Sequence, residues 1–198
     1  MQFKVIGYYT KATRYEELSW RLLNSCDAFA IPHYIEAIED LGSWEKNTHH
    51  KSQFVKECLE KFPEEDLLYV DVDAVFNSYP VLIPQLPEDV HIAYRTENFP
   101  WRKDEPLSGT IFFRNTPKTL QVVEKWQELN QKTPAVRNRP ETWEQQNLKR
   151  ALEACDDVIY YNLPPEYTFI TDHTRRLFPG LQAIVEHYQE SRNQHRRA

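Results

Sequence analysis

The sequence predicts a single α/β domain over residues 1–198, with a mostly parallel central sheet covered by helices on both faces. Strand-like and helix-like segments alternate through the first half of the chain, as in sheets built from helical crossovers. Residues 67–70 (LLYV) are continuously apolar, which is typical of a strand buried on both faces. The length suits one domain, and we find no internal repeat, low-complexity segment or domain boundary.

The first half of the chain shows the clearest secondary-structure signals. Phe54, Cys58 and Phe62 recur at helical spacing, and Pro63 follows them, so we expect an amphipathic helix that ends there. The β-rich N-terminal segment FKVIGYY is expected to form the first buried strand. The predicted strands are 3–9, 28–31 and 67–70, the predicted helices are 15–27 and 51–62, and 40–48 is a predicted loop.

The second half of the chain is less regular. Thr116-Pro117 has the form of an N-cap followed by proline at the first helical position. Thr142 and Gln145 have the spacing of a capping box at the start of another helix. The strands expected here are 90–95, 110–114, 158–161 and 181–185.

The composition excludes several function classes. With 24 Lys and Arg against 30 Asp and Glu, the net charge is −6, which argues against broad nucleic-acid binding. Basic residues gather in 137–139 and in the tail at about 188–198, either as solvated ends or as phosphate-facing segments. Only four glycines occur, and neither the P-loop nor the dinucleotide-binding fingerprint is present.

The chain has no apolar run long enough to span a bilayer and no signal-peptide pattern. Its three cysteines are far apart and lie in predicted helices, so we expect buried thiols in a reducing compartment and no zinc site. The sequence therefore predicts a cytoplasmic protein.

The strongest chemical signal is LLYVDVDAVF, in which Asp71 and Asp73 follow the apolar strand. Ligands of open α/β sheets collect at the carboxyl ends of strands. Two carboxylates there can share a hard cation, Mn²⁺ or Mg²⁺, whose remaining ligands a diphosphate supplies. The alternative is that the two acids merely begin a turn.

Further motifs follow in an order that carries a resemblance. In chain order they are Tyr8-Tyr9-Thr10 at the end of the first strand, Lys51 at a helix start, Asp71-x-Asp73, Ser108-Gly109-Thr110, Glu144-Gln145 and His187. With this order the chain resembles the glycosyltransferase A-type fold, especially the glycogenin-like nucleotide-diphospho-sugar transferases. The resemblance covers nearly the whole chain.

The resemblance implies roles for these residues. The nucleotide and its donor sugar would be bound by Tyr8, Tyr9, Thr10, Tyr15, Lys51, Asp71, Ser108, Gly109 and Arg192; the metal by Asp71, Asp73 and His187; and Glu144 and Gln145 would act at the catalytic centre. Trp44 and the His49-His50 pair are further candidates for the lining of the site.

Each of these residues also has a structural interpretation, and at this stage both remain open. Tyr15 could pack on the core, Lys51 could be solvated, Gly109 could form an ordinary turn and His187 could be structural. The sequence departs from the family pattern at Glu144, because aspartate is usual there, and the longer side chain changes the geometry.

The function that these residues predict is metal-dependent transfer of a sugar from a nucleoside-diphosphate sugar, expected to be a UDP-sugar, to an acceptor hydroxyl group. The resemblance implies retention of the anomeric configuration. The acceptor could be a glycan, a protein, a small molecule or a modified nucleic-acid base, and the oligomeric state is not predicted.

Two alternatives come from other classes. In a phosphohydrolase of the haloacid-dehalogenase type, Asp71 would be a nucleophile and Asp156-Asp157 a second acidic pair. Lys51 and His187 would then be unexplained. The other alternative is a non-catalytic module that binds a sugar nucleotide or a glycan.

Overall fold

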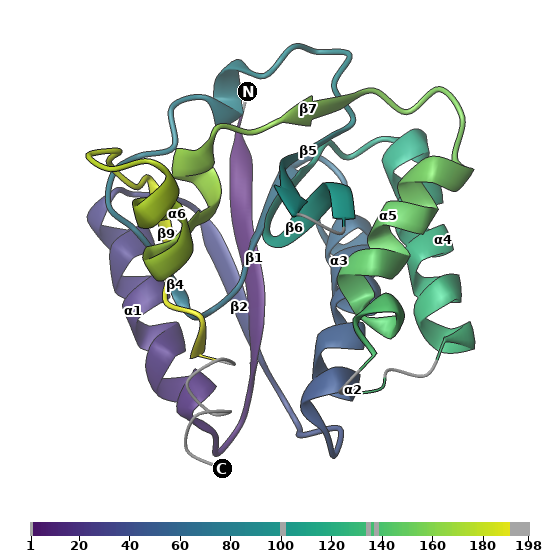
Figure 1. The fold of residues 1–198 in the computed structure, drawn as a ribbon, viewed down its shortest axis with the longest axis horizontal. Coiled ribbons are helices and arrows are strands. Elements are labelled where there is room, and N and C mark those ends of the chain that lie inside the picture. The colour runs from purple at the N-terminus through teal and green to yellow at the C-terminus, as the bar shows by residue number, and fades with distance from the viewer. Residues whose placement is uncertain (1, 100–101, 134–135, 137–138, 191–198) are drawn as a thin grey trace.

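A six-stranded sheet runs through the centre of the protein, with helices on both sides (Figure 1). The computed structural model describes residues 2–99, 102–133, 136 and 139–190. The strand order is β2-β1-β3-β6-β5-β7. The strands are β1 Phe3–Thr10, β2 His33–Ile38, β3 Asp66–Val70, β5 Ile92–Phe99, β6 Arg102–Phe113 and β7 Tyr160–Asn162.

The sheet is mostly parallel, as the sequence predicts. β1 pairs in parallel with β2 and β3, and β5 pairs in parallel with β7. β6 is the exception, because it runs antiparallel to both β3 and β5. β6 therefore lies beside the strand that carries the Asp-x-Asp motif, with Val70 opposite Thr110.

The helices divide between the two faces of the sheet. On one face α1 contributes Leu22 and Cys26 to a core with Phe3 and Val5. On the other face α3, α4 and α5 pack together around Trp126, which is fully buried. The helices are α1 Arg14–Ala28, α2 Trp44–His49, α3 Lys51–Lys61, α4 Pro117–Lys132, α5 Glu144–Ala154 and α6 Thr171–Leu177, with short 3-10 turns at Ile83–Gln85, Pro140–Thr142 and Pro165–Thr168.

Capping explains where the helices begin. Thr13 caps α1 by accepting from the backbone N–H of Tyr15, and Glu16 reaches back to the N–H of Ala12. Thr116 caps α4 as predicted, with proline at the first helical position. The cap of α4 was predicted from Thr116-Pro117, whereas the cap of α1 was not predicted.

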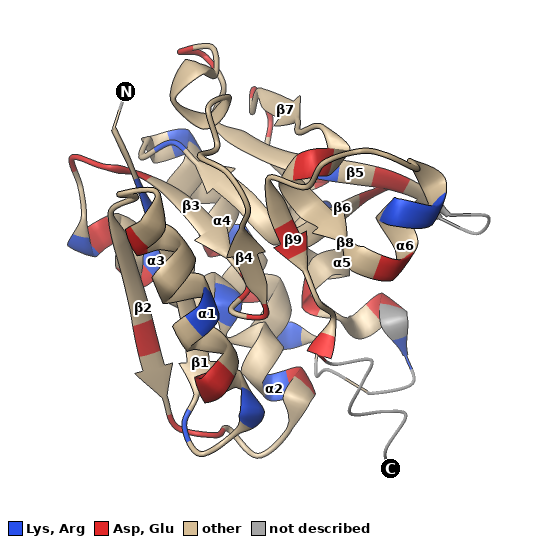
Figure 2. Ribbon diagram, turned by 90° about the vertical axis from the view of Figure 1, so that its left-hand side faces the viewer, with Lys and Arg blue, Asp and Glu red and all other residues tan. Residues whose placement is uncertain are grey.

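A second, three-stranded sheet brings the end of the chain to the Asp-x-Asp motif. Its strands are β4 Ala74–Phe76, β8 Phe169–Ile170 and β9 Val185–His187, in the order β4-β9-β8. Figure 2 shows β4 beside β9. Their antiparallel register sets His187 opposite Ala74, which directly follows Asp73 in the chain.

Three predicted elements differ from the structure, namely the strands at 28–31 and 181–185 and the loop at 40–48. The last strand, β9, begins only at Val185. Residues 28–31 are not a strand, because the backbone N–H groups of Phe29 and Ile31 both bond to Cys26 O and so close the end of α1. The strand begins after Pro32, a position where the missing N–H does no harm. The predicted loop 40–48 contains the start of α2, which Ser43 caps.

The predicted capping box at α5 does not form. Trp143 is the N-cap and makes no side-chain cap hydrogen bond. The hydroxyl of Thr142 instead accepts from Val136 N and donates to Arg139 O, which closes the preceding loop. The start of α5 is fixed by its tertiary contacts rather than by a local cap.

Cys26, Cys58 and Cys155 are free and buried, as predicted. Within the described ranges, no helix has the length and apolar character needed to cross a bilayer. Lys and Arg are interspersed with Asp and Glu on the side of the molecule that Figure 2 shows.

Candidate functional site

Asp71 and Asp73 lie at the carboxyl end of β3, where the sequence predicts a ligand site. Asp71 directly follows the strand, and its N–H donates to Gly109 O on β6 at 2.9 Å. A turn then follows, closed by a 3.0 Å hydrogen bond from Ala74 N to Asp71 O. This turn keeps both carboxylates at the same edge of the sheet.

His187 joins the two carboxylates. Asp71, Asp73 and His187 each offer one ligand atom, and these atoms all lie within 4.8 Å of one another. The side chains of His187 and Asp73 are 2% and 11% exposed, with 3.9 Å between His187 Nδ1 and Asp73 Oδ1. The fold therefore brings together predicted metal-binding residues that are far apart in the sequence.

The space beside these residues fits a cation. A Cβ atom on Gly109 would lie 2.9 Å from His187 Cε1, 3.1 Å from His187 Nδ1 and 3.2 Å from Asp71 Oδ2. Glycine therefore keeps open a point that an oxygen and a nitrogen ligand both face. Two carboxylates and an imidazole are ligands that a divalent cation takes in proteins.

The groups around Asp73 favour its ionised form. Burial alone would raise the pKa of Asp73, but the neighbouring His187 imidazole, the N–H of Glu190 and Lys51 lower it below its ordinary value. Glu190 N donates to Asp73 Oδ2 at 2.9 Å. Asp73 is therefore ionised at neutral pH.

Gly109 lies in an irregularity of the β5–β6 ladder. Tyr94 is opposite Ile111, but the next residue, Arg95, is opposite Leu107. Residues 108–110 thus have no register partner on β5 and bulge from the ladder. Bulges of this kind re-aim side chains next to functional sites.

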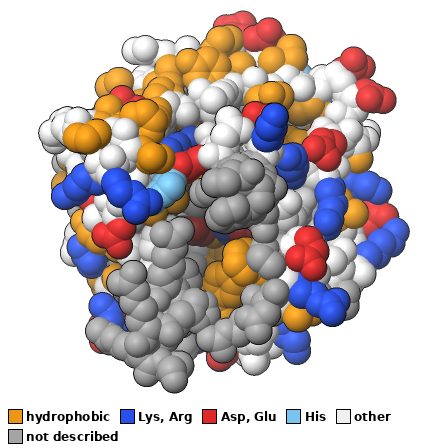
Figure 3. Space-filling model, in the orientation of Figure 1, with side chains coloured by type: hydrophobic (Ala, Val, Ile, Leu, Met, Phe, Trp, Pro, Cys, Tyr) orange, Lys and Arg blue, Asp and Glu red, His pale blue; other side chains and the backbone are white. Residues whose placement is uncertain are grey.

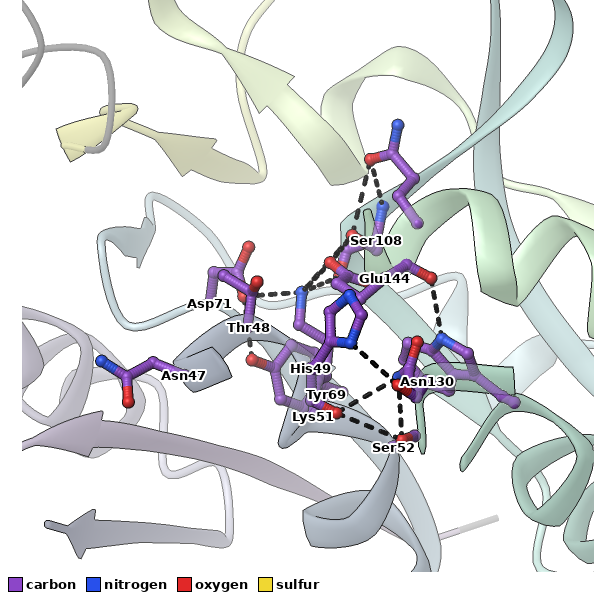
Figure 4. A network of polar contacts seen from close by, with 12 residues as sticks. Asn47, Thr48, His49, Lys51, Ser52, Tyr69, Asp71, Ser108, Asn130 and Glu144 are labelled. Atoms are coloured by element: carbon purple, nitrogen blue, oxygen red, sulfur yellow. Dashed lines mark hydrogen bonds and ion pairs between the residues drawn. The ribbon is translucent and has the colours of Figure 1, made fainter. Parts of the chain in front are cut away.

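Lys51 is buried at the centre of a polar network (Figure 4). Its ammonium lies 3.1 Å from Asp71 Oδ1 and 3.0 Å from Glu144 Oε1, and it donates to Ser108 O at 3.1 Å. Burial alone would lower the pKa of Lys51, but the carboxylates of Asp71 and Glu144 raise it above its ordinary value. Lys51 is thus a buried cation rather than a solvated surface lysine.

Glu144 and Gln145 lie at the start of α5 and face the bulge. Ser108 Oγ donates to Glu144 Oε1 at 2.6 Å, and the Gln145 amide donates to Glu105 Oε1 at 2.8 Å. Glu144 Oε2 is buried and accepts no hydrogen bond within the described parts of the chain. The indole of Trp126 donates to Glu144 O at 2.8 Å and so fixes the start of the helix.

The residues predicted to bind the nucleotide have different surroundings in the structure. The Tyr8 hydroxyl donates to Asn47 O at 2.6 Å, and its ring contacts the rings of His50 and Phe54. Tyr8 therefore connects β1 to α2 and α3, and its hydroxyl is already used within the protein. The Trp44 ring contacts that of Trp143 edge to face, with 6.0 Å between centroids.

Tyr15 lies within electrostatic reach of Asp73 and Asp71. Thr10 is buried and hydrogen-bonds to Thr13 at 3.0 Å. The pKa of the half-buried Tyr15 is raised, mainly by burial and to a lesser extent by the negative charges of Asp73 and Asp71. Tyr9 packs on the α1 side of the core. Arg192 lies outside the described residues.

Several contacts of the acidic cluster were not predicted, and two of them come from side chains of the sheet. Tyr69 donates to Asp71 Oδ1 at 2.8 Å, and Thr110 Oγ1 lies 2.8 Å from His187 Nε2. Tyr69 could have been found, because residues two apart on a strand share a face. The contact between Thr110 and His187 joins residues far apart in sequence and had no local signal.

The structure was compared with known proteins. No protein-family model matches the chain, and no curated protein matches its sequence. A glycosyltransferase involved in the glycosylation of the major capsid of PBCV-1 superposes with a TM-score of 0.74 at 17% identity, covering 98% of each chain.

Two further glycosyltransferases are similar over part of their length. GlyE of Streptococcus pneumoniae TIGR4 gives a TM-score of 0.68 at 14% identity over 94% of this chain and 55% of its own. The bifunctional WbbM gives 0.59 at 11% identity over 95% of this chain and 46% of its own. This chain thus spans about half the length of each. At these identities the likeness concerns the fold, and the chain has the glycosyltransferase A-type fold that its sequence predicts.

Proposed function

We propose that the protein is a metal-dependent glycosyltransferase that moves a sugar from a nucleoside-diphosphate sugar, a UDP-sugar, to an acceptor hydroxyl group. The observation that carries the proposal is the convergence of Asp71, Asp73 and His187 beside Gly109, on a glycosyltransferase fold. The phosphohydrolase hypothesis leaves His187 and the buried Lys51 without a role.

Asp71, Asp73 and His187 would hold the cation. Their carboxylates suit Mn²⁺ or Mg²⁺, and the imidazole nitrogen favours the softer Mn²⁺. When bound, the cation neutralises negative charge on the diphosphate leaving group. The excess of carboxylate over ammonium in this network attracts the cation.

Lys51 would act through the carboxylates as well as on the donor. Four oxygen atoms lie within 3.3 Å of its ammonium, two from Ser108 and one each from Asp71 and Glu144. An ammonium has only three N–H groups, so a phosphate oxygen would have to replace one of these partners. We therefore assign Lys51 to holding Asp71 and Glu144 in place. Its positive charge would attract the diphosphate through space, without a direct hydrogen bond.

Glu144 and Gln145 would contact the donor sugar or the acceptor. Glu144 Oε2 is buried without a hydrogen-bond donor in the described ranges, and such an atom is costly unless a ligand or water supplies one. A sugar hydroxyl is a suitable donor. The resemblance to glycogenin-like enzymes favours transfer with retention of configuration.

Calorimetric titration with UDP, with and without Mn²⁺, tests the proposal. We expect binding that requires Mn²⁺ and that weakens at least tenfold, or about 1.4 kcal/mol, in Asp71→Asn. Asp172→Asn is the matched control, since Asp172 is exposed on α6. UDP binding that ignores Mn²⁺ and Asp71→Asn would reject the metal site.

A second assay separates the alternatives. Slow Mn²⁺-dependent hydrolysis of a UDP-sugar, lost in Asp71→Asn, is expected of a transferase without its acceptor. Binding without any turnover would indicate a sugar-nucleotide-binding module. Phosphate release from simple phosphate esters, without UDP binding, would indicate the phosphohydrolase.

A further inference from the structure

Asp71, Asp73 and His187 each have two polar side-chain atoms, and one atom of each pair makes a polar contact within the protein. Asp71 Oδ1 accepts from Tyr69 Oη at 2.8 Å and lies 3.1 Å from Lys51 Nζ. Asp73 Oδ2 accepts from Glu190 N at 2.9 Å. The remaining side chain is His187, whose Nε2 lies 2.8 Å from Thr110 Oγ1.

The other atom of each pair faces the common point. Asp71 Oδ2 and His187 Nδ1 lie 3.2 Å and 3.1 Å from the position that a Cβ on Gly109 would take. Asp73 Oδ1 lies 3.9 Å from the same Nδ1. The protein thus selects, for every ligand, which atom it presents.

We infer that Tyr69 and Thr110 are positioning residues that make Asp71 bind the cation through Oδ2 and His187 through Nδ1. This inference rests on the proposed metal-dependent function. It goes beyond naming the ligands, because it assigns the ligating atoms and the residues that select them.

The choice of the imidazole nitrogen depends on the hydroxyl of Thr110. A neutral imidazole carries its proton on one nitrogen and a lone pair on the other. When the Thr110 hydroxyl accepts from Nε2–H, the lone pair of Nδ1 faces the cation. Without an acceptor at Nε2, the proton can instead lie on Nδ1, where it blocks the cation.

The sheet fixes both positioning residues. Thr110 is fully buried and is opposite Val70 in the β3–β6 ladder. Tyr69 is 2% exposed and precedes Asp71 by two residues, so its side chain leaves the strand on the same face. Neither side chain can turn away without disturbing the core.

The test compares Thr110→Val and Tyr69→Phe with matched substitutions outside the site. Thr119→Val also removes a buried hydroxyl, one that donates to His91 O at 3.2 Å. Tyr167→Phe also removes a buried phenol, one that accepts from Leu82 N at 2.9 Å. The primary measurement is the affinity for Mn²⁺ in the absence of nucleotide, obtained from the electron paramagnetic resonance signal of free Mn²⁺. Thermal unfolding is followed in parallel.

We expect Thr110→Val and Tyr69→Phe each to weaken Mn²⁺ binding about 10- to 100-fold, the range for groups that orient metal ligands. Thr119→Val and Tyr167→Phe should bind Mn²⁺ as the unsubstituted protein does. Equal affinity in all five proteins would overturn the inference.

Nitrogen NMR of ¹⁵N-labelled histidine, with Cd²⁺ as a diamagnetic probe, tests the assignment of atoms. We expect the Nδ1 resonance of His187 to shift on Cd²⁺ binding and Nε2 to remain protonated. Coordination through Nε2 would overturn the inference even if Mn²⁺ binds. Failure of the proposed function has a different signature, since the unsubstituted protein would then bind no cation at all, and the inference would be wrong with it.

Discussion

Gly109→Ala tests the site with the smallest possible change, a single methyl group. The new Cβ would lie 2.9 Å from His187 Cε1 and 3.2 Å from Asp71 Oδ2. His187 is buried and is held by Thr110 and by the β4–β9 ladder, so it cannot simply rotate away. We expect the methyl group to press on both His187 and Asp71 and to shift their ligand atoms.

The size of the effect follows from these contacts. Overpacking a buried site by one carbon costs about 1–3 kcal/mol. In a chain of this size, 1 kcal/mol lowers Tm by about 2–4 °C, so we expect a folded protein whose Tm is roughly 2–12 °C lower. Mn²⁺ affinity should fall by at least tenfold, because the methyl group displaces two of the three proposed ligands.

Gly180→Ala separates the loss of the site from general destabilisation. Gly180 has a φ of +88° and no heavy atom within 4 Å of its Cβ position, so alanine there strains the backbone without touching the site. Such strain costs about 1–2 kcal/mol. Calorimetry with Mn²⁺ and UDP should show normal affinity for Gly180→Ala and greatly reduced affinity for Gly109→Ala. Wild-type affinity in Gly109→Ala would refute the location of the cation, and equal losses in both variants would show that instability is the cause.

Three further predictions concern the polar network of the site and the packed cores on the two faces of the sheet. Lys51→Met leaves the carboxylates of Asp71 and Glu144 without the ammonium that they share. The free energy of unfolding, measured in urea, should therefore fall by about 3 kcal/mol, and Mn²⁺ should restore part of this loss. Unchanged stability would refute this role of Lys51. Burial raises the pKa of Cys26 and Cys58 to about 12, so a thiol reagent at pH 8 should label them only after unfolding, and rapid labelling of the native protein would contradict this burial. Trp126→Phe removes the hydrogen bond to Glu144 O and should lower stability by about 1–3 kcal/mol while Mn²⁺ affinity stays the same, which thermal unfolding and titration can check.

The elements that were predictable are those with a local signal. The apolar run 67–70 and the acids after it specify a buried strand with ligands at its carboxyl end. The helix beginning at Lys51 has a complete apolar face, and the helix beginning at Pro117 has an N-cap and a proline. Asp71 and Asp73 were identified as candidate ligands for the same reason, because the chain itself places them together.

The elements that were missed depend on distant contacts. Strands β4 and β8 have three and two residues, too few to show any periodicity. The short helix α2 is polar and follows Gly42, and its Ser43 cap looks like a turn signal in the sequence. The bulge at 108–110 is a property of two paired strands, so neither strand reveals it alone. The contact between Thr110 and His187 needs both that bulge and the pairing of β9 with β4.

Glu144 stands where the resemblance implies an aspartate, and this network offers a consistent explanation. Its carboxylate oxygen Oε1 reaches both Lys51, at 3.0 Å, and Ser108 Oγ, at 2.6 Å, from a backbone that Trp126 fixes. Lys51 is shared in turn between Glu144 and Asp71, so the cation site and the start of α5 are joined through one ammonium. The longer side chain therefore keeps the carboxylate in the site, joined to Asp71 through Lys51, while Oε2 stays available for a ligand hydroxyl.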